Sequence, residues 1–143
     1  MPILNYTTKI SPSKTIGEIQ EILVNHGASS IACEYDSVTK RPVSVRFGLL
    51  INNSNVFFEL PANYEGVLKA MKADQTIKST FCNIDQAVKV AWRILKDWIE
   101  AQCAIIEAGL AEMSEVFLPY AVTQNGSTLY KEIKANTNLL LKS

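Results

Sequence analysis

The feature that most constrains the fold is the stretch from Asn83 to Pro119, which has the pattern of one long amphipathic helix. Asn83 is a favourable N-cap, and Gln86 three residues later completes a capping-box-like pair. Because Pro119 cannot continue a helix, the pattern predicts a helix over residues 84–118. At about 1.5 Å per residue it would span roughly 50 Å. A compact domain of this length is nearer about 40 Å across, so the helix is expected to outrun its own domain.

Two apolar stripes run along this predicted helix. If one stripe covers the protomer's own sheet, the other needs a partner, and a second copy of the chain is the simplest partner. We therefore expect oligomerisation through the helix over residues 84–118. The alternative is a monomer whose helix breaks at Gly109 and packs entirely within itself. The first stripe contains Ile84, Val88, Ala91, Leu95, Trp98 and Ile105, and the second contains Trp92, Ile99, Cys103, Ile106, Leu110, Met113 and Phe117.

The remaining chain predicts an α+β domain. Residues 30–35, 43–51 and 55–60 alternate apolar and polar side chains between turn-forming sequences, which is typical of an antiparallel β-meander with one buried face. Arg46 should point to the opposite face. Shorter helices are expected over residues 15–26, capped by Thr15, over residues 63–72, and after Ser127; residues 6–10 suit an edge strand. The 143 residues suit one domain, in which the meander packs against the long helix.

Composition excludes several classes of partner. Lysine plus arginine and aspartate plus glutamate number 14 each, which argues against binding a nucleic-acid polymer nonspecifically or a membrane surface. No apolar run has the length of a membrane span, and the start of the chain lacks the pattern of a signal peptide, so a cytoplasmic protein is expected. The three cysteines and the single histidine lack the close spacing of zinc ligands, so they predict reduced thiols and no metal or cofactor.

A charged stripe on the long helix is the first candidate for function. Lys89, Arg93 and Lys96 come early in the helix, against the preference of the helix dipole, and Glu100 follows. Cations beside the free backbone donors of a helix start attract phosphate or another anion, and Phe81 or Trp92 could stack on a base. The alternative is a solvated face on which Lys89 or Arg93 pairs with Asp97 or Glu100. This alternative is stronger on the residues alone.

Motifs for catalysis are missing from the sequence. It contains no glycine-rich phosphate loop, no nucleophile elbow and no HExxH pair. His26, the only histidine, falls in the last turn of a predicted helix, which favours a dipole contact over catalysis. We therefore expect a protein that is not an enzyme.

A family resemblance is carried by the opening MPILNYTTKI and above all by the run from AVKVAWRILKDWIEAQCAIIEAGL to VFLPY. In these segments the sequence resembles the phage Thoeris anti-defence sponges. The resemblance implies a phage protein that binds and sequesters a cyclic ADP-ribose isomer in the host cytosol, without cleaving it. It also implies a homodimer, or a dimer or trimer of dimers, with pockets at the protomer interface. By this resemblance an aromatic contacts the base and arginines hold the phosphates; a lysine stands where a second helix arginine is expected. Cyclic oligonucleotides are a second ligand class. The predicted ligand-binding residues are Phe81, Gln86, Lys89, Trp92, Arg93, Lys96 and Arg46.

Two other functions fit the sequence. The exposed apolar stripe could dock a host protein, which would make the chain a protein-interaction module. A nuclease or hydrolase of the same signals is the third class. Binding measurements and the fate of the bound nucleotide separate the three.

Overall fold

The computed structural model describes residues 1–140 and shows an α+β fold with a three-stranded antiparallel meander. The strands are β1 (Ser30–Tyr35), β2 (Pro42–Ile51) and β3 (Ser54–Pro61), in the order β1-β2-β3. The predicted strands are therefore confirmed to within about a residue at each end. Residues 6–10 are the exception, because they form turns and coil instead of an edge strand.

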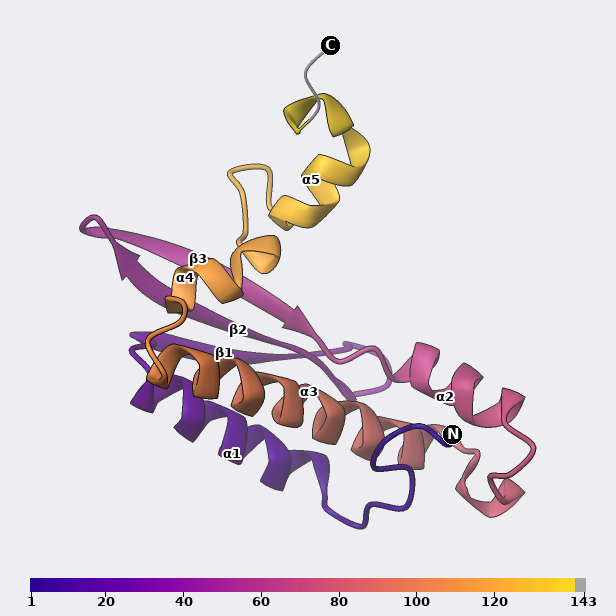
Figure 1. Cartoon of the computed structure of the whole chain (residues 1–143). Helices are drawn as coiled ribbons and strands as arrows, with labels where there is room; N and C mark the ends of the chain where they lie inside the picture. The colour runs from indigo at the N-terminus through magenta and orange to yellow at the C-terminus, as the bar shows by residue number, and fades with distance from the viewer. Residues whose placement is uncertain (141–143) are drawn as a thin grey trace.

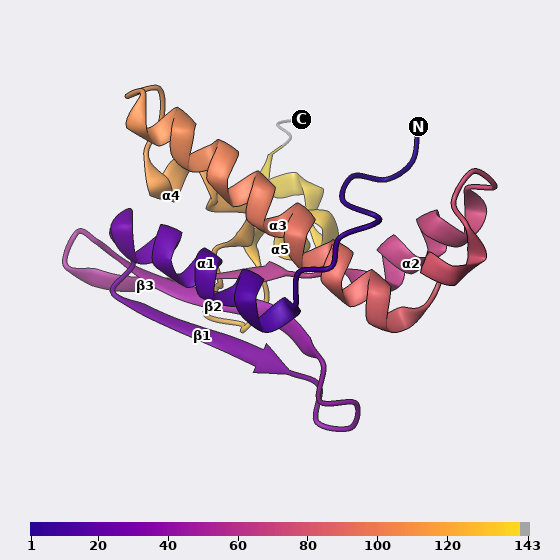
Figure 2. The same cartoon turned by 90° about the horizontal axis from the view of Figure 1, so that it is seen from below.

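Two helices, α1 (Pro12–Asn25) and α3 (Ile84–Glu107), cover one face of the sheet side by side (Figures 1 and 2). Their side chains form the main core with alternate residues of β2 and β3. Helix α2 (Tyr64–Ala73) packs on the first half of α3, where Met71, Ile77, Ala87 and Val90 form a smaller core. The main core includes Ile19, Leu23, Val45, Phe47, Phe58, Leu60, Trp92, Ile99 and Phe117.

Helix α1 begins earlier than the sequence suggested. Ser11 is its N-cap, accepting a hydrogen bond from the backbone N–H of Lys14 at 3.2 Å, and Pro12 occupies the first turn. The prediction of Thr15 as the cap was wrong, because Thr15 is fully buried against α3. Asn83 does cap α3, accepting from the backbone N–H of Gln86 at 2.9 Å.

The prediction of a helix over residues 84–118 was wrong at its C-terminal end. Gly109 adopts a left-handed φ of +77°, and the N–H groups of Gly109 and Leu110 donate to the carbonyls of Ile106 and Ile105. This is the Schellman motif, which ends a helix where glycine accepts the left-handed conformation. With 24 residues α3 spans about 36 Å and fits its own domain.

The apolar stripes of α3 are used within the protomer. Trp92, Ile99 and Cys103 from the second stripe are buried in the core, and after the turn Phe117 joins them. Leu110 in the turn itself is exposed. From the first stripe Val88 and Ala91 are buried, whereas Leu95 and Trp98 are partly buried and Ile105 is 38% exposed. The helix is shorter than predicted, and oligomerisation through it stays a prediction.

The chain after α3 runs back along the free edge of β3. It contains α4 (Met113–Val116), the short 3-10 turn η2 (Leu118–Tyr120), α5 (Leu129–Ala135) and η3 (Thr137–Leu139). Ala121 and Val122 bridge to β3, with the N–H of Val122 donating to the carbonyl of Phe57 at 2.7 Å. From there residues 118–140, the C-terminal arm, stand off from the body beyond β3 (Figure 1). Thr128 caps α5, one residue from the predicted cap; the last residues of the predicted frayed tail, 141–143, lie outside the described residues.

Candidate functional site

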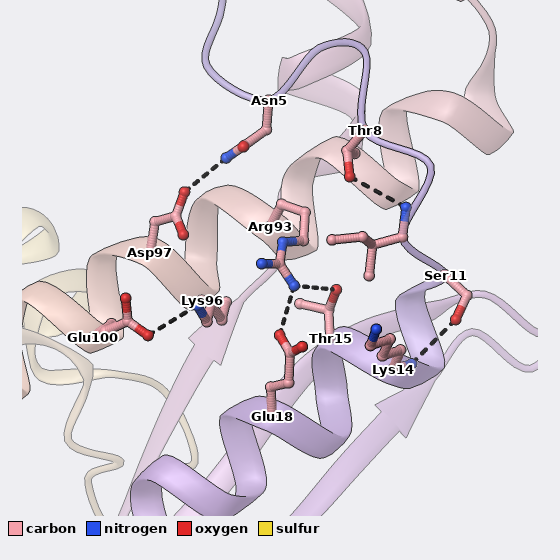
Figure 3. A network of polar contacts seen from close by, with 11 residues as sticks. Asn5, Thr8, Ser11, Lys14, Thr15, Glu18, Arg93, Lys96, Asp97 and Glu100 are labelled. Carbon is pink, nitrogen blue, oxygen red and sulfur yellow. Dashed lines mark hydrogen bonds and ion pairs between the residues drawn. The ribbon is translucent and has the colours of Figure 1, made fainter.

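The predicted cations of α3 are mostly held by intramolecular ion pairs. Arg93 donates from Nη1 to the Glu18 carboxylate at 2.6 Å and to the Thr15 hydroxyl at 3.4 Å, so it ties α3 to α1 (Figure 3). Its side chain is only 13% exposed. Lys96 pairs with Glu100 at 2.8 Å, one turn further along α3. Lys89 is half-buried and has no ion pair among residues 1–140.

The two predicted stacking residues are also packed inside the fold. Trp92 is 0% exposed, and its Nε1 donates to the carbonyl of Pro42 at 3.2 Å, so it cannot stack on a ligand without opening the core. Phe81 lies at the end of η1 (Ser79–Phe81), where its ring meets Tyr6 edge to face with centroids 5.7 Å apart. The Phe81 side chain is partly buried.

Gln86 anchors the N-terminal segment. Its Nε2 donates to the carbonyls of Tyr6 and Thr8, both at 2.9 Å. Asn5 makes a third link, donating to Asp97 at 2.8 Å (Figure 3). Within one protomer, six of the seven predicted ligand-binding residues thus lie along α3 or just before it, and three of them, Phe81, Gln86 and Arg93, contact α1 or the N-terminal segment.

Arg46 is placed differently. It points away from α1 and α3, on the sheet face that these helices do not cover, which we call the outer face; this confirms its predicted direction. Its side chain is 36% exposed, and Nε lies 3.9 Å from a carboxylate oxygen of Glu34. This Nε atom is buried, and it has no hydrogen-bond partner among the described residues. Such a donor costs about 1–3 kcal/mol when unpaired, so its presence calls for an explanation.

A cleft of about 680 Å³ opens beside Arg46, between the outer face and the C-terminal arm. Neighbours of Arg46 on the sheet form one wall, since Glu59 is its cross-strand partner and Ser44 and Glu34 lie one step away. Arg46 itself does not line this outer cleft but lies next to three residues that do. The outer cleft is lined by Glu34, Ser44, Glu59, Tyr120, Tyr130 and Lys131, among others.

The opposite wall depends on how the C-terminal arm folds. The N–H of Leu129 donates to the carbonyl of Ala121 at 2.7 Å, which turns α5 back toward the sheet. Glu132 stabilises the turn before α5 by accepting from the hydroxyls of Ser127 and Thr123 and from the amide of Asn125. These hydrogen bonds, the one from Ser127 first, hold the pKa of Glu132 below its ordinary value.

The chemistry of the outer cleft favours binding. Two carboxylates can accept from ribose or base donors, two tyrosines offer ring faces, and Lys131 supplies a cation at the rim. Its size falls within the range of about 300–1,000 Å³ that small-molecule sites occupy. Tyr120 and the neighbouring Pro61 also line a smaller apolar cleft of about 310 Å³ between α2, α3 and β3.

Nucleophilic and metal chemistry have few candidates. Cys103 is buried, and burial, with Glu107 and Glu100 nearby, raises the pKa of its thiol to about 11, so the thiol stays protonated near neutral pH. No three acidic, cysteine or histidine side chains within residues 1–140 gather as metal ligands would. Across the same residues, none of the helices combines the length and the apolar character that crossing a membrane requires.

The residues that the sequence missed are Glu34, Glu59, Tyr120, Tyr130 and Lys131. They come from β1, β3, η2 and α5, and no spacing in the sequence relates them, because the return of the C-terminal arm to the edge of β3 brings them together. No family model matches the sequence, and neither a curated protein nor a solved structure matches it significantly.

Proposed function

We propose that the protein binds and sequesters a small cyclic nucleotide in the outer cleft, without cleaving it. The observation that carries the proposal is a nucleotide-sized cleft with tyrosines on one wall and Arg46, with its unpartnered Nε, behind the other. The Arg46 side chain is 36% exposed and its nearest carboxylate oxygen is 3.9 Å away, so the exposed part of its guanidinium can donate to a phosphate or a carbonyl oxygen of the ligand. The resemblance to anti-defence sponges supports a cyclic ADP-ribose isomer as the ligand, bound in the cytosol of an infected bacterium.

The proposal moves the site from α3 to the sheet. Arg93 would have to leave Glu18, which it contacts at 2.6 Å, in order to hold a phosphate. Arg46 is held more loosely, because its Nε lies 3.9 Å from the nearest carboxylate oxygen and makes no hydrogen bond. Tyr120 and Tyr130 take the role first given to Phe81 and Trp92. Tyr130, at 57% exposed, has an accessible ring on which a base can stack.

Isothermal titration calorimetry with cyclic ADP-ribose isomers, cyclic dinucleotides and cyclic trinucleotides tests this function. We expect one of these classes to bind, and Arg46→Met to weaken it by about 10- to 100-fold, as the loss of a charged hydrogen bond predicts. Arg41→Met is the matched control, because Arg41 is similarly exposed, at 32%, and has a similarly loose ion pair at 3.7 Å to Asp85. The two arginines differ in place, because Arg46 lies next to three residues that line the outer cleft, whereas Arg41 reaches Asp85 at the start of α3. If no class binds the wild-type protein, the proposal fails.

The fate of the bound nucleotide separates sequestration from hydrolysis. After incubation and heat denaturation, a sponge releases its ligand chemically intact, whereas a nuclease or hydrolase releases products. Chromatography of the released nucleotide gives the answer. Products that scale with protein concentration would show an enzyme.

A protein-interaction module is the second candidate, and one observation favours it. Exposed apolar side chains follow one another after α3, at 76% for Leu110, 50% for Leu118 and 57% for Tyr130. Single exposed apolar residues are ordinary and contiguous ones mark docking surfaces; these three supply apolar area on the same stretch of chain. A clean monomer in light scattering, together with no affinity for any of the nucleotides above, would favour this function.

A further inference from the structure

Strand β1 has an open edge. The N–H of Ala62 donates to the carbonyl of Val43, which shows that the backbone groups of Val43 point toward β3. Because these groups alternate in an antiparallel ladder, those of Val45 and Phe47 also point toward β3. The backbone groups of Ser44, Arg46 and Gly48 therefore point toward β1. Their partners in β1 are Glu34, Ala32 and Ser30. By alternation, the backbone N–H and C=O groups of Ile31, Cys33 and Tyr35 point outward, away from β2.

This edge lacks the usual protection against strand pairing. β1 contains no lysine and no proline, and the single irregularity of the β1–β2 ladder falls at its far end, between Glu34 and Tyr35. Figure 2 shows β1 as the outermost strand, with α1 above the sheet and no helix or strand of residues 1–140 beside the edge. Three donors and three acceptors are thus presented in a row.

We propose that a second copy of the chain pairs along this edge, antiparallel, with the twofold axis at Cys33. This register uses all three outward-pointing residues, because Cys33 faces Cys33 and Ile31 faces Tyr35 in both directions. It joins two three-stranded sheets into one six-stranded sheet. The interface reaches the outer cleft, because Glu34 lines that cleft and Arg46 borders it, so in the dimer Glu34 of the other copy and a ligand would share one guanidinium. Cys33, which the tests below replace, does not line the outer cleft.

Two features make the edge complementary to itself. On the helix side, Ile31 packs on Tyr35 of the other copy, which covers a ring that is 57% exposed in the protomer. On the outer face, Glu34 lies opposite Ala32 of the other copy, whose neighbour on β2 is Arg46. The small Ala32 side chain leaves room for Glu34 to reach that guanidinium. The opposite charges therefore meet twice, once on each side of the axis.

Sedimentation of a proline variant tests the interface. Cys33→Pro removes an outward-pointing N–H, and an edge strand tolerates proline at such a position, so the protomer should still fold while the dimer dissociates. Cys33→Ala keeps the N–H and is the matched control; it should remain a dimer. Circular dichroism and thermal melting establish that both variants are folded. A wild-type monomer, or a folded Cys33→Pro variant that remains a dimer, overturns the proposal.

Oxidative cross-linking provides a second measurement that does not depend on the proline variant folding. Hydrogen-bonded antiparallel residues have Cα atoms about 5.5 Å apart, within the range of about 4.4–6.8 Å that disulfides span. A Cys82→Ser variant, in which buried Cys103 is shielded, should form a covalent dimer on mild oxidation, and a Cys33→Ser, Cys82→Ser double variant should not. The proposal is overturned if the first variant gives no covalent dimer or if the second still gives one.

Discussion

The two faces of the sheet differ in how completely their polar groups are used. On the face that α1 and α3 cover, Trp92, Arg93 and Gln86 each find a partner within 3.2 Å, and the tryptophan is fully buried. On the outer face, Arg46 keeps a buried Nε without a hydrogen bond and borders the outer cleft. The polar groups of α3 named here are used within the protomer, whereas the outer face keeps an unpartnered donor.

This difference shows why a cationic stripe on a helix is weak evidence for a ligand. Arg93 lies within reach of Glu18 because α1 packs beside α3, and this ion pair would have to open before Arg93 could hold a phosphate. The contrast between the faces can be tested by substitutions on each side.

Trp92→Ala should have the largest effect. Trp92 fills the centre of the main core, and truncating a buried aromatic costs about 3–5 kcal/mol of the free energy of unfolding. Trp92→Phe, which keeps most of the volume but loses the bond to Pro42, should cost clearly less. Urea denaturation followed by circular dichroism measures both. Equal losses would mean that the hydrogen bond, not the packing, stabilises this position.

Arg93→Met should come next, at about 1.5–3 kcal/mol, because it leaves the partly buried Glu18 carboxylate without its charged partner. The double variant Arg93→Met, Glu18→Gln should lose less than the sum of the two single variants. A thermodynamic cycle from chemical denaturation gives the coupling energy. Additive losses would show that the ion pair at 2.6 Å contributes nothing of its own.

Arg46→Met should change the free energy of unfolding by less than about 1 kcal/mol, because it removes a weak ion pair and an unpartnered donor together. The same denaturation experiment checks this value. A loss as large as that of Arg93→Met would make Arg46 a structural residue and remove the contrast between the two faces.

The smallest expected effect concerns pH. Both ring nitrogens of His26 face acceptors at 2.7 Å, the Ile22 carbonyl and the Glu107 carboxylate, and the bond to Ile22 is the main cause that raises the pKa of His26 above 6.5. Because the pKa of His26 is higher in the folded protein than in the unfolded chain, protonation of His26 stabilises the fold. This stabilisation is complete below the pKa of the unfolded chain and is lost as the pH rises through the pKa of the folded protein. The wild-type advantage over His26→Gln should thus shrink above pH 6.5. An advantage that grows with pH in the same denaturation series would contradict this assignment.

Much of the fold could be predicted from local patterns. The meander follows from the alternation in residues 43–51, and α3 begins at the expected cap because Asn83 offers its side chain to Gln86. The end of α3 was missed, although Gly109 followed by Leu110 is a helix stop, because the apolar spacing continues across the turn. That spacing reflects a chain that re-enters the same core through Phe117.

Among the predicted binding residues, Arg46 is the one whose place on the outer face could be predicted, because it follows from the period of a strand. The other predicted residues were chosen for charge and aromaticity, which do not reveal a partner 75 residues away, as in the case of Arg93 and Glu18. The walls of the outer cleft depend on the packing of the C-terminal arm, which rests on backbone bonds such as that between Val122 and Phe57.

The ties between the N-terminal segment and α3 affect the order of folding during synthesis. Asn5, Tyr6 and Glu18 bind residues 75 to 92 positions later, so the first helix lacks its main neighbour while the middle of the chain is being made. At ribosomal rates of about 5–20 residues per second, that wait lasts roughly 4–18 seconds. Until α3 emerges, the first helix can pack only on the strands that precede α3, and the ties through Asn5, Gln86 and Arg93 form only after α3 has emerged.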